Sequence, residues 1–274
     1  MTALKELAQE WLPPVAIRWF KTIRHGSENR FEGPFATWEE ARAKCTGYDA
    51  TEILARVLAS TLKVKRGEAA FERDSVVFTD TEYAWPVLAG LMWAAARSRG
   101  RLNVLDFGGA LGSSYFQNYK FLQTLPDVRW SIVEQHHYVE AGKAQIQNEH
   151  LRFYQTIEEC LSENEPKVIL LSSVLQYLPS PSSVLLELNK VNADAIVIDR
   201  TIVNQSTFDR VYVQHVPASI YTANYPCWSL SEPALLAGLG KHYLPLADFP
   251  SLNFPALKSI KSEFKGYIFL RQTE

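Results

Sequence analysis

The residues most able to do chemistry lie in residues 103–114, where a short apolar run reaches Asp106 and is followed by a glycine-rich turn. Gly108, Gly109 and Gly112 would let a ligand approach the backbone closely, because glycine carries no side chain. Open α/β sheets bind their ligands at the carboxyl ends of their strands, which is where Asp106 would lie. The segment therefore predicts a nucleotide-type cofactor site between a buried strand and a helix.

The spacing of the glycines distinguishes two kinds of cofactor site. The dinucleotide fingerprint G-x-G-x-x-G, started at Gly108, needs glycine where the chain has Ala110 and Ser113. The pattern present, D-x-G-x-A-x-G, resembles the first motif of class I S-adenosylmethionine (SAM) methyltransferases, with Ala110 in place of the middle glycine. The resemblance implies an SAM site. For the motif alone, a purely structural turn or another ligand is the alternative.

A second carboxylate follows the turn at a suitable distance. Glu134 ends an apolar stretch about 20 residues after Gly112, as the acidic residue of a β-α-β cofactor site does. At the end of the neighbouring strand it could accept hydrogen bonds from both ribose hydroxyls. The alternative is a solvated charge at a strand end.

Alternating strands and helices over residues 101 to about 200 must position these groups. Strands are expected near residues 103–107, 130–134, 151–154, 167–173 and 193–199, with two more near 242–246 and 266–271. The intervening segments are long enough for right-handed crossovers, and the strongly apolar fourth strand is typical of a sheet covered on both faces. The resemblance implies a Rossmann-like α/β class I methyltransferase fold, with a mostly parallel seven-stranded sheet and a final antiparallel strand.

Residues 1–100 lack this alternation, and we expect them to form a helical N-terminal extension or cap. Residues 101–274 would form the SAM-binding domain, with an insert at about 201–240. Helices in the extension are expected over residues 35–44, 51–62 and 83–97. Thr37 and Glu40 have the spacing of a capping box.

The segment of residues 13–25 combines basic side chains with apolar ones at helical spacing. Such a helix can lie on an anionic membrane surface, although its shortness favours packing on its own domain or on a partner subunit. No apolar run reaches the roughly 18 residues needed to span a bilayer, and there is no secretory signal. We therefore expect a cytoplasmic protein, peripheral to the inner membrane if this helix binds it. The sequence is also compatible with a homo-oligomer.

Charge and cysteine content exclude several classes of function. A net charge of −2 over 274 residues argues against nucleic acid as a partner. The three cysteines are far apart and form no C-x-x-C pair, so the sequence predicts neither disulfides nor a metal site.

Residues 170–181 carry a second resemblance, to the S-x-V-L-H-H-L-x-D-P segment after the fourth strand of many small-molecule methyltransferases. Ser172 and Ser173 would then lie near the transferable methyl group. Gln176 and Tyr177 replace the common histidine pair, which removes one possible catalytic base.

Several separate motifs together resemble a bacterial family of methyltransferases associated with surface-polysaccharide gene clusters. They are residues 33–35, 38–41, 47–49, 72–75, 106–118, 133–135, 171–178, 198–201 and 213–228. The resemblance implies SAM as the cofactor and a glycan or other small molecule as the methyl acceptor. The cofactor-binding residues that it implies are Asp106, Gly108, Gly109, Ala110, Gly112, Glu134, Gln135, Ser172 and Ser173.

Methyl transfer is an in-line displacement, so the protein must hold a nucleophile about 3 Å from the methyl group. A hydroxyl acceptor also needs a base to take its proton. The candidate bases are His215, Asp199, Asp74 and Tyr221. The candidate acceptor-binding residues are Arg73 and Arg200, which could bind an anionic group, and Tyr177 and Tyr225, of which Tyr225 could stack on a sugar ring.

Two other functions stay open. One is a nicotinamide-dependent oxidoreductase or epimerase, which the glycine spacing disfavours. The other is a non-catalytic scaffold with the SAM-binding fold. The charge-dense segment of residues 68–75 is likewise open, because it could form a structural ion-pair cluster or reach into the active site.

Overall fold

A ten-stranded sheet forms the centre of the computed structural model, which describes residues 30–45, 50–216, 223–239, 242–252, 254 and 256–272. Seven of its strands follow the order β6-β5-β4-β7-β8-β12-β11, and all neighbours are parallel except β12, which runs antiparallel to β8 and β11. These strands are β4 (Arg101–Phe107), β5 (Asp127–Val133), β6 (Leu151–Tyr154), β7 (Val168–Ser172), β8 (Ala195–Asn204), β11 (Tyr243–Pro250) and β12 (Glu263–Arg271). The predicted Rossmann-like class I methyltransferase fold is confirmed.

The strand order reverses between β4 and β7, because the chain proceeds from β4 outward to β6 and then returns to β7 on the other side. A reversal of this kind leaves a crevice outside the carboxyl ends of the two strands, where open α/β sheets bind ligands.

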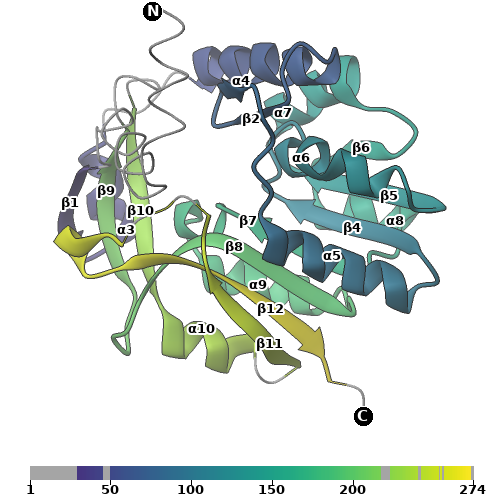
Figure 1. Ribbon diagram of the computed structural model, residues 1–274. Coiled ribbons are helices and arrows are strands. Elements are labelled where there is room, and N and C mark those ends of the chain that lie inside the picture. The colour runs from purple at the N-terminus through teal and green to yellow at the C-terminus, as the bar shows by residue number, and fades with distance from the viewer. Residues whose placement is uncertain are drawn as a thin grey trace, which may run out of the picture.

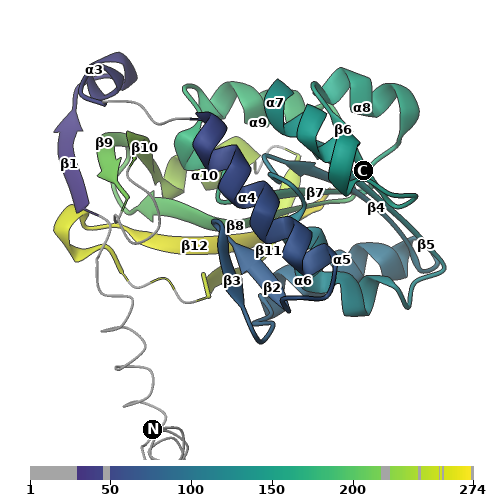
Figure 2. The same cartoon turned by 90° about the horizontal axis from the view of Figure 1, so that it is seen from above.

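Helices cover both faces of the sheet (Figures 1 and 2). One face packs against α5 and α6, and the other packs against α8, α9 and α10. The helices of this part of the chain are α5 (Trp85–Arg97), α6 (Ser113–Leu122), α7 (His136–Ala141), α8 (Ile157–Glu163), α9 (Pro181–Asn189) and α10 (Glu232–Leu239). Three short helical turns add η1 (Gly142–Ile146), η2 (Leu175–Tyr177) and η3 (Lys258–Ile260). Both faces of the central strands are therefore apolar, as a covered parallel sheet requires.

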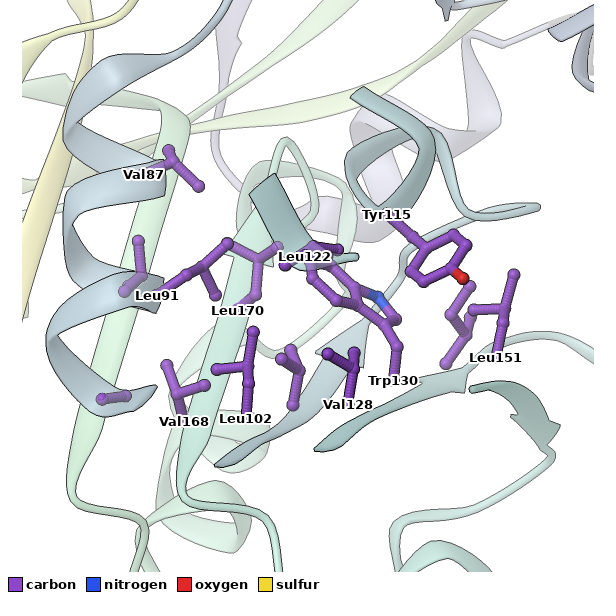
Figure 3. Close-up of a cluster of buried hydrophobic side chains, with 14 of the residues drawn as sticks. Val87, Leu91, Leu102, Tyr115, Leu122, Val128, Trp130, Leu151, Val168 and Leu170 are labelled. Atoms are coloured by element: carbon purple, nitrogen blue, oxygen red, sulfur yellow. The ribbon is translucent and has the colours of Figure 1, made fainter. Parts of the chain in front are cut away.

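The core under α5 and α6 includes the buried indole of Trp130. Figure 3 shows Trp130 of β5 beside the ring of Tyr115 of α6, and their centroids are 5.8 Å apart at an interplanar angle of 69°. Both side chains are buried, in an edge-to-face arrangement that aromatic pairs favour. This packing fixes α6, and with it the glycine turn that precedes α6, against the sheet.

The three helices expected in the N-terminal region are present as α3 (Trp38–Ala43), α4 (Ala50–Lys65) and α5. The Thr37 side chain accepts a hydrogen bond from the Glu40 backbone N–H at 3.1 Å, and the Glu40 carboxylate accepts one from the Ala36 N–H at 3.1 Å. Glu40 thus reaches back across the start of α3, so the first helix begins as the capping pattern predicts.

Strands that the sequence patterns do not predict connect this region to the rest of the chain. They are β1 (Arg30–Phe35), β2 (Phe71–Arg73) and β3 (Val76–Phe78). β1 pairs with β9 (Arg210–His215), β9 pairs with β10 (Asn224–Ser231), and β10 joins β8 through two residue pairs near the end of β8. The segment after β8 therefore contributes a β-hairpin that extends the central sheet.

Residues 13–25 lie outside the described residues. In the ranges that the structure describes, no helix is long and apolar enough to cross a membrane.

Candidate functional site

The glycine turn between β4 and α6 has the backbone that its sequence predicts. Gly108 and Gly112 have φ angles of 73° and 97°, in the left-handed region that glycine favours. A Cβ on Gly108 would lie 2.4 Å from Cγ2 of Val174, so any side chain there would displace the segment after β7. α6 begins without a side-chain cap, which leaves its first backbone N–H groups available to a ligand.

Ala110, the one departure from the methyltransferase motif, also adopts a left-handed conformation, with φ of 49°. This explains why a glycine is common there, since a left-handed conformation costs an alanine about 1–2 kcal/mol. The turn keeps its shape at that cost.

Asp106 lies beneath the turn and is only 1% exposed. One carboxylate oxygen, Oδ2, accepts a hydrogen bond from the Trp130 indole N–H at 2.9 Å, whereas Oδ1 has no partner among the described residues. Burial raises the pKa of Asp106 to about 7, against the opposing effects of the Trp130 hydrogen bond and the Arg200 charge. A Cβ on Gly109 would lie 2.5 Å from the carboxyl carbon, so the turn packs directly on this acid. An unpaired, buried oxygen at this point is a group that a cationic or N–H-bearing ligand would satisfy.

Glu134 follows the last residue of β5 and lies next to the turn. The Gly108 N–H donates to the Val133 carbonyl oxygen at 2.9 Å, which joins the turn to the strand end that carries Glu134. The carboxylate accepts a hydrogen bond from the N–H of Gln135 at 2.5 Å, and burial raises its pKa. Gln135 itself is exposed. The two carboxylates and the turn are thus brought together.

The end of β7 and the middle of β8 bring a second group of the expected residues together. The Ser172 hydroxyl oxygen accepts hydrogen bonds from Nη2 and Nε of Arg200 at 3.0 and 3.3 Å. Nε of Arg200 also lies 3.5 Å from Oδ2 of Asp199. The Ser173 N–H donates to the Asp199 carbonyl oxygen at 2.9 Å. Asp199 is buried and lies at the sheet edge where an acceptor hydroxyl could approach it.

Glu72 is the site residue for which the sequence left two readings open. It lies on β2, is 1% exposed, and accepts a hydrogen bond from the hydroxyl of Ser113, the first residue of α6. Its other oxygen, Oε2, has no hydrogen-bond partner in the described part of the chain. Burial raises the pKa of Glu72 to about 7, partly offset by the Ser113 hydrogen bond. In the sequence, the many charged residues over positions 68–75 are the feature that points to Glu72. The structure places this segment against the start of α6.

The other candidate bases lie elsewhere. His215 is the last residue of β9, 3.4 Å from the Glu32 carboxylate. Its neighbour Gln214 accepts a hydrogen bond from the Tyr177 hydroxyl at 3.1 Å. Because consecutive side chains of a strand point to opposite faces, His215 faces away from Tyr177, on the side of the hairpin that packs on α3. The structure does not bring His215 to the glycine turn.

Asp74 is exposed and forms, with Ser75, the two-residue turn between β2 and β3, where both residues have positive φ. Tyr225 packs edge-on against Tyr177 at 5.1 Å, which ties the hairpin to η2. Tyr221 lies outside the described residues.

Two further observations bear on ligands. A hollow of about 750 Å³ lies along the edge strand β6, and its mixed acidic and basic lining includes none of the expected site residues. Among the described residues, no group of three or more histidine, cysteine or acidic side chains is placed to hold a metal ion.

No family model matches the sequence, and no curated protein matches it. Solved structures of similar fold include the N-terminal domain of EvdMO1 with S-adenosylhomocysteine (SAH) and D-fucose, at 15% identity over 83% of this chain and 98% of that chain (TM-score 0.46). Another is an SAM-dependent methyltransferase from Clostridium acetobutylicum, at 10% identity over 82% and 100% of the two chains (TM-score 0.48). A third is magnesium protoporphyrin IX methyltransferase from Synechocystis with bound SAM, at 12% identity over 83% and 99% (TM-score 0.44). At these identities and scores, the likeness assigns neither an activity nor a ligand to this chain.

Proposed function

We propose that this protein is an SAM-dependent methyltransferase that methylates a hydroxyl oxygen of a glycan or of a small-molecule precursor. The observation that carries the proposal is the joining of the glycine turn to two carboxylates, Asp106 beneath it and Glu134 beside it, at the switch point of the sheet.

The residues present fit the cofactor. Gly108 and Gly109 let the turn pack closely on Val174 and Asp106, where a Cβ would clash, and α6 offers backbone N–H groups that no side chain caps. The unpaired oxygen of Asp106 is suited to the amino-acid end of SAM, which carries an ammonium group. Glu134 is suited to the ribose hydroxyls. Ala110 and Ser113 replace the second and third glycines of the dinucleotide fingerprint, which disfavours a nicotinamide cofactor.

When bound, SAM supplies a methyl group activated by the sulfonium cation. The protein's part is to position an acceptor and to receive its proton. Asp199 is the base that the geometry favours, since it is buried beside Ser172 and Arg200 at the carboxyl edge of the sheet. The glycan class of acceptor rests on the sequence resemblance. Contact of residues 13–25 with a membrane and assembly into a homo-oligomer are further expectations of the sequence.

Titration calorimetry with SAM, SAH and NAD tests the proposal. The wild-type protein should bind SAM and SAH at micromolar concentrations and bind NAD far more weakly. Glu134→Ala should weaken SAM binding about 100-fold, because two hydrogen bonds to a charged group contribute roughly 3 kcal/mol. The matched control is Glu140→Ala, an exposed glutamate on α7, which should bind like wild type.

Preferential binding of NAD would instead support an oxidoreductase or epimerase. Binding of none of the three compounds would support a non-catalytic scaffold.

A further inference from the structure

A small pocket lies beside the first turn of α6, at the carboxyl end of β7 and next to the middle of β8. Its polar lining includes Ser113 and Gln117 of α6, Ser172 of β7, and two arginines, Arg73 of β2 and Arg200 of β8. The arginines come from segments far apart in the chain, and both line the same pocket.

Arg200 reaches the pocket because β8 is irregular at this point. In the pairing of β8 with β12 the register shifts between Lys265 and Tyr267, so Asp199 and Arg200 together stand opposite Gly266. Consecutive side chains of a regular strand point to opposite faces, yet both Asp199 and Arg200 line the pocket. A bulge of this kind re-aims a side chain, and such bulges are common next to active sites.

The conformation of Arg200 is strained and firmly held. Its φ of 52° is left-handed, which costs a non-glycine residue of order 1–3 kcal/mol. The Gln176 side chain donates to its carbonyl oxygen at 2.9 Å, and its own N–H donates to the Ser251 hydroxyl at 3.0 Å. Gln176 is fully buried, at a position where the related motif has histidine. The surroundings therefore impose the bulge.

Arg73 faces Arg200 without a direct counter-charge. Its guanidinium lies 5.9 Å from the Phe78 ring centre and 5.6 Å from that of Phe254. It makes no hydrogen bond, and no ion pair within 4 Å, with any described residue. Burial and the charge of Arg200 lower its pKa, and the opposing effects of the carboxylates of Asp74, Glu82 and Asp199 are smaller. Two like charges held in one pocket create a site for an anion, and guanidinium groups match carboxylate and phosphate geometry.

We propose that Arg73 and Arg200 together bind an anionic group, a carboxylate or a phosphate, of the methyl acceptor. The inference rests on the proposed methyltransferase function and deepens it by naming the charge of the substrate. Asp199 and Ser172 lie against Arg200, so an acceptor anchored there holds its remaining hydroxyls near the candidate base. The uncapped start of α6 would offer the carboxylate of the cofactor another partner.

The test titrates inorganic phosphate and acetate into protein saturated with SAH, so that the cofactor's own carboxylate is already bound. Wild type should bind at least one of the two anions. Arg73→Gln and Arg200→Gln should each weaken that binding at least about 10-fold, since each removes a charge-assisted pair. Arg97→Gln is the matched control, because Arg97 also stacks on an aromatic ring, at 5.0 Å from Trp93, but lies outside the pocket. SAH affinity, within about twofold of wild type, shows that the variants are folded with the cofactor site intact.

Three results overturn the proposal. The first is that SAH-loaded wild type binds neither anion, and the second is that both glutamine variants bind the anions as wild type does. The third is that the variants bind SAH much more weakly than wild type does, but bind an SAH analogue without the carboxylate as well as wild type does. That result would mean that the arginines bind the carboxylate of the cofactor. If wild type binds no SAH at all, the proposed function itself fails, a result distinct from the other three.

Discussion

Replacing Glu72 with glutamine should stabilise the protein at alkaline pH and destabilise it modestly at acid pH. Burial raises the pKa of Glu72 from 4.5 to about 7. The unfolded chain therefore ionises this group at lower pH than the folded chain does, and stability is lost as pH rises from 4.5 to about 7. A shift of this size corresponds to roughly 3 kcal/mol. Glutamine carries no charge at any pH, and its amide oxygen can still accept the hydrogen bond from Ser113.

The gain is reduced because the new amide N–H₂ must be buried where no acceptor is provided, at a cost of about 1–2 kcal/mol. We therefore expect Glu72→Gln to raise the free energy of unfolding by about 1–2 kcal/mol at pH 8, and to lower it by about 1–2 kcal/mol at pH 4.5, where the folded wild type is protonated and only the cost of the buried amide remains. The assay is reversible urea unfolding of wild type and variant across this pH range, without cofactor. Glu140→Gln, an exposed glutamate on α7, should show no pH-dependent difference.

A variant less stable than wild type at pH 8 but equal to it at pH 4.5 would refute the reasoning. That result would mean that ionised Glu72 stabilises the fold, as a partner of the neighbouring arginines rather than as a buried acid.

The remaining predictions concern the turn and the acid beneath it. Gly108→Ala should lower the free energy of unfolding by about 3 kcal/mol and abolish SAM binding in calorimetry, because φ is positive and the new Cβ meets Val174. Ala110→Gly should keep SAM binding and change stability by less than about 1 kcal/mol, since relief of the left-handed alanine is offset by a more flexible unfolded chain; a loss of binding would contradict this. Trp130→Phe should destabilise the protein by about 2 kcal/mol and raise the pKa of Asp106 further, because it removes the hydrogen bond that the indole N–H donates to that carboxylate. Thermal unfolding and titration of the carboxyl by NMR measure the two effects, and an unchanged pKa would exclude the assigned role.

Local patterns predicted the parts of the site that local sequence determines. The apolar run before Asp106, the glycines after it and Glu134 about 20 residues later define strand, turn and strand within one β-α-β unit. The positive φ of Ala110 shows why the motif favours glycine at that residue, and nothing in the structure explains the alanine. Residues close in sequence encode this geometry, so its spacing is visible without a structure.

Contacts between segments far apart in the chain determine the other features of the site. The hairpin that carries His215 pairs with β1, and the register of that pairing turns the imidazole towards Glu32 rather than the site. Glu72 enters the site only because the β2–β3 hairpin packs on the start of α6. The bulge at Arg200 depends on pairing with a strand some 60 residues later. None of these contacts leaves a periodic signal in the sequence.

A crystal structure of the protein with SAH tests the central claim most directly. The account predicts both ribose hydroxyls within about 3 Å of the Glu134 carboxylate, and the amino-acid end of SAH against the turn of residues 108–112 above Asp106. SAH bound elsewhere, such as in the hollow along β6, or bound with its ribose away from Glu134, would contradict it.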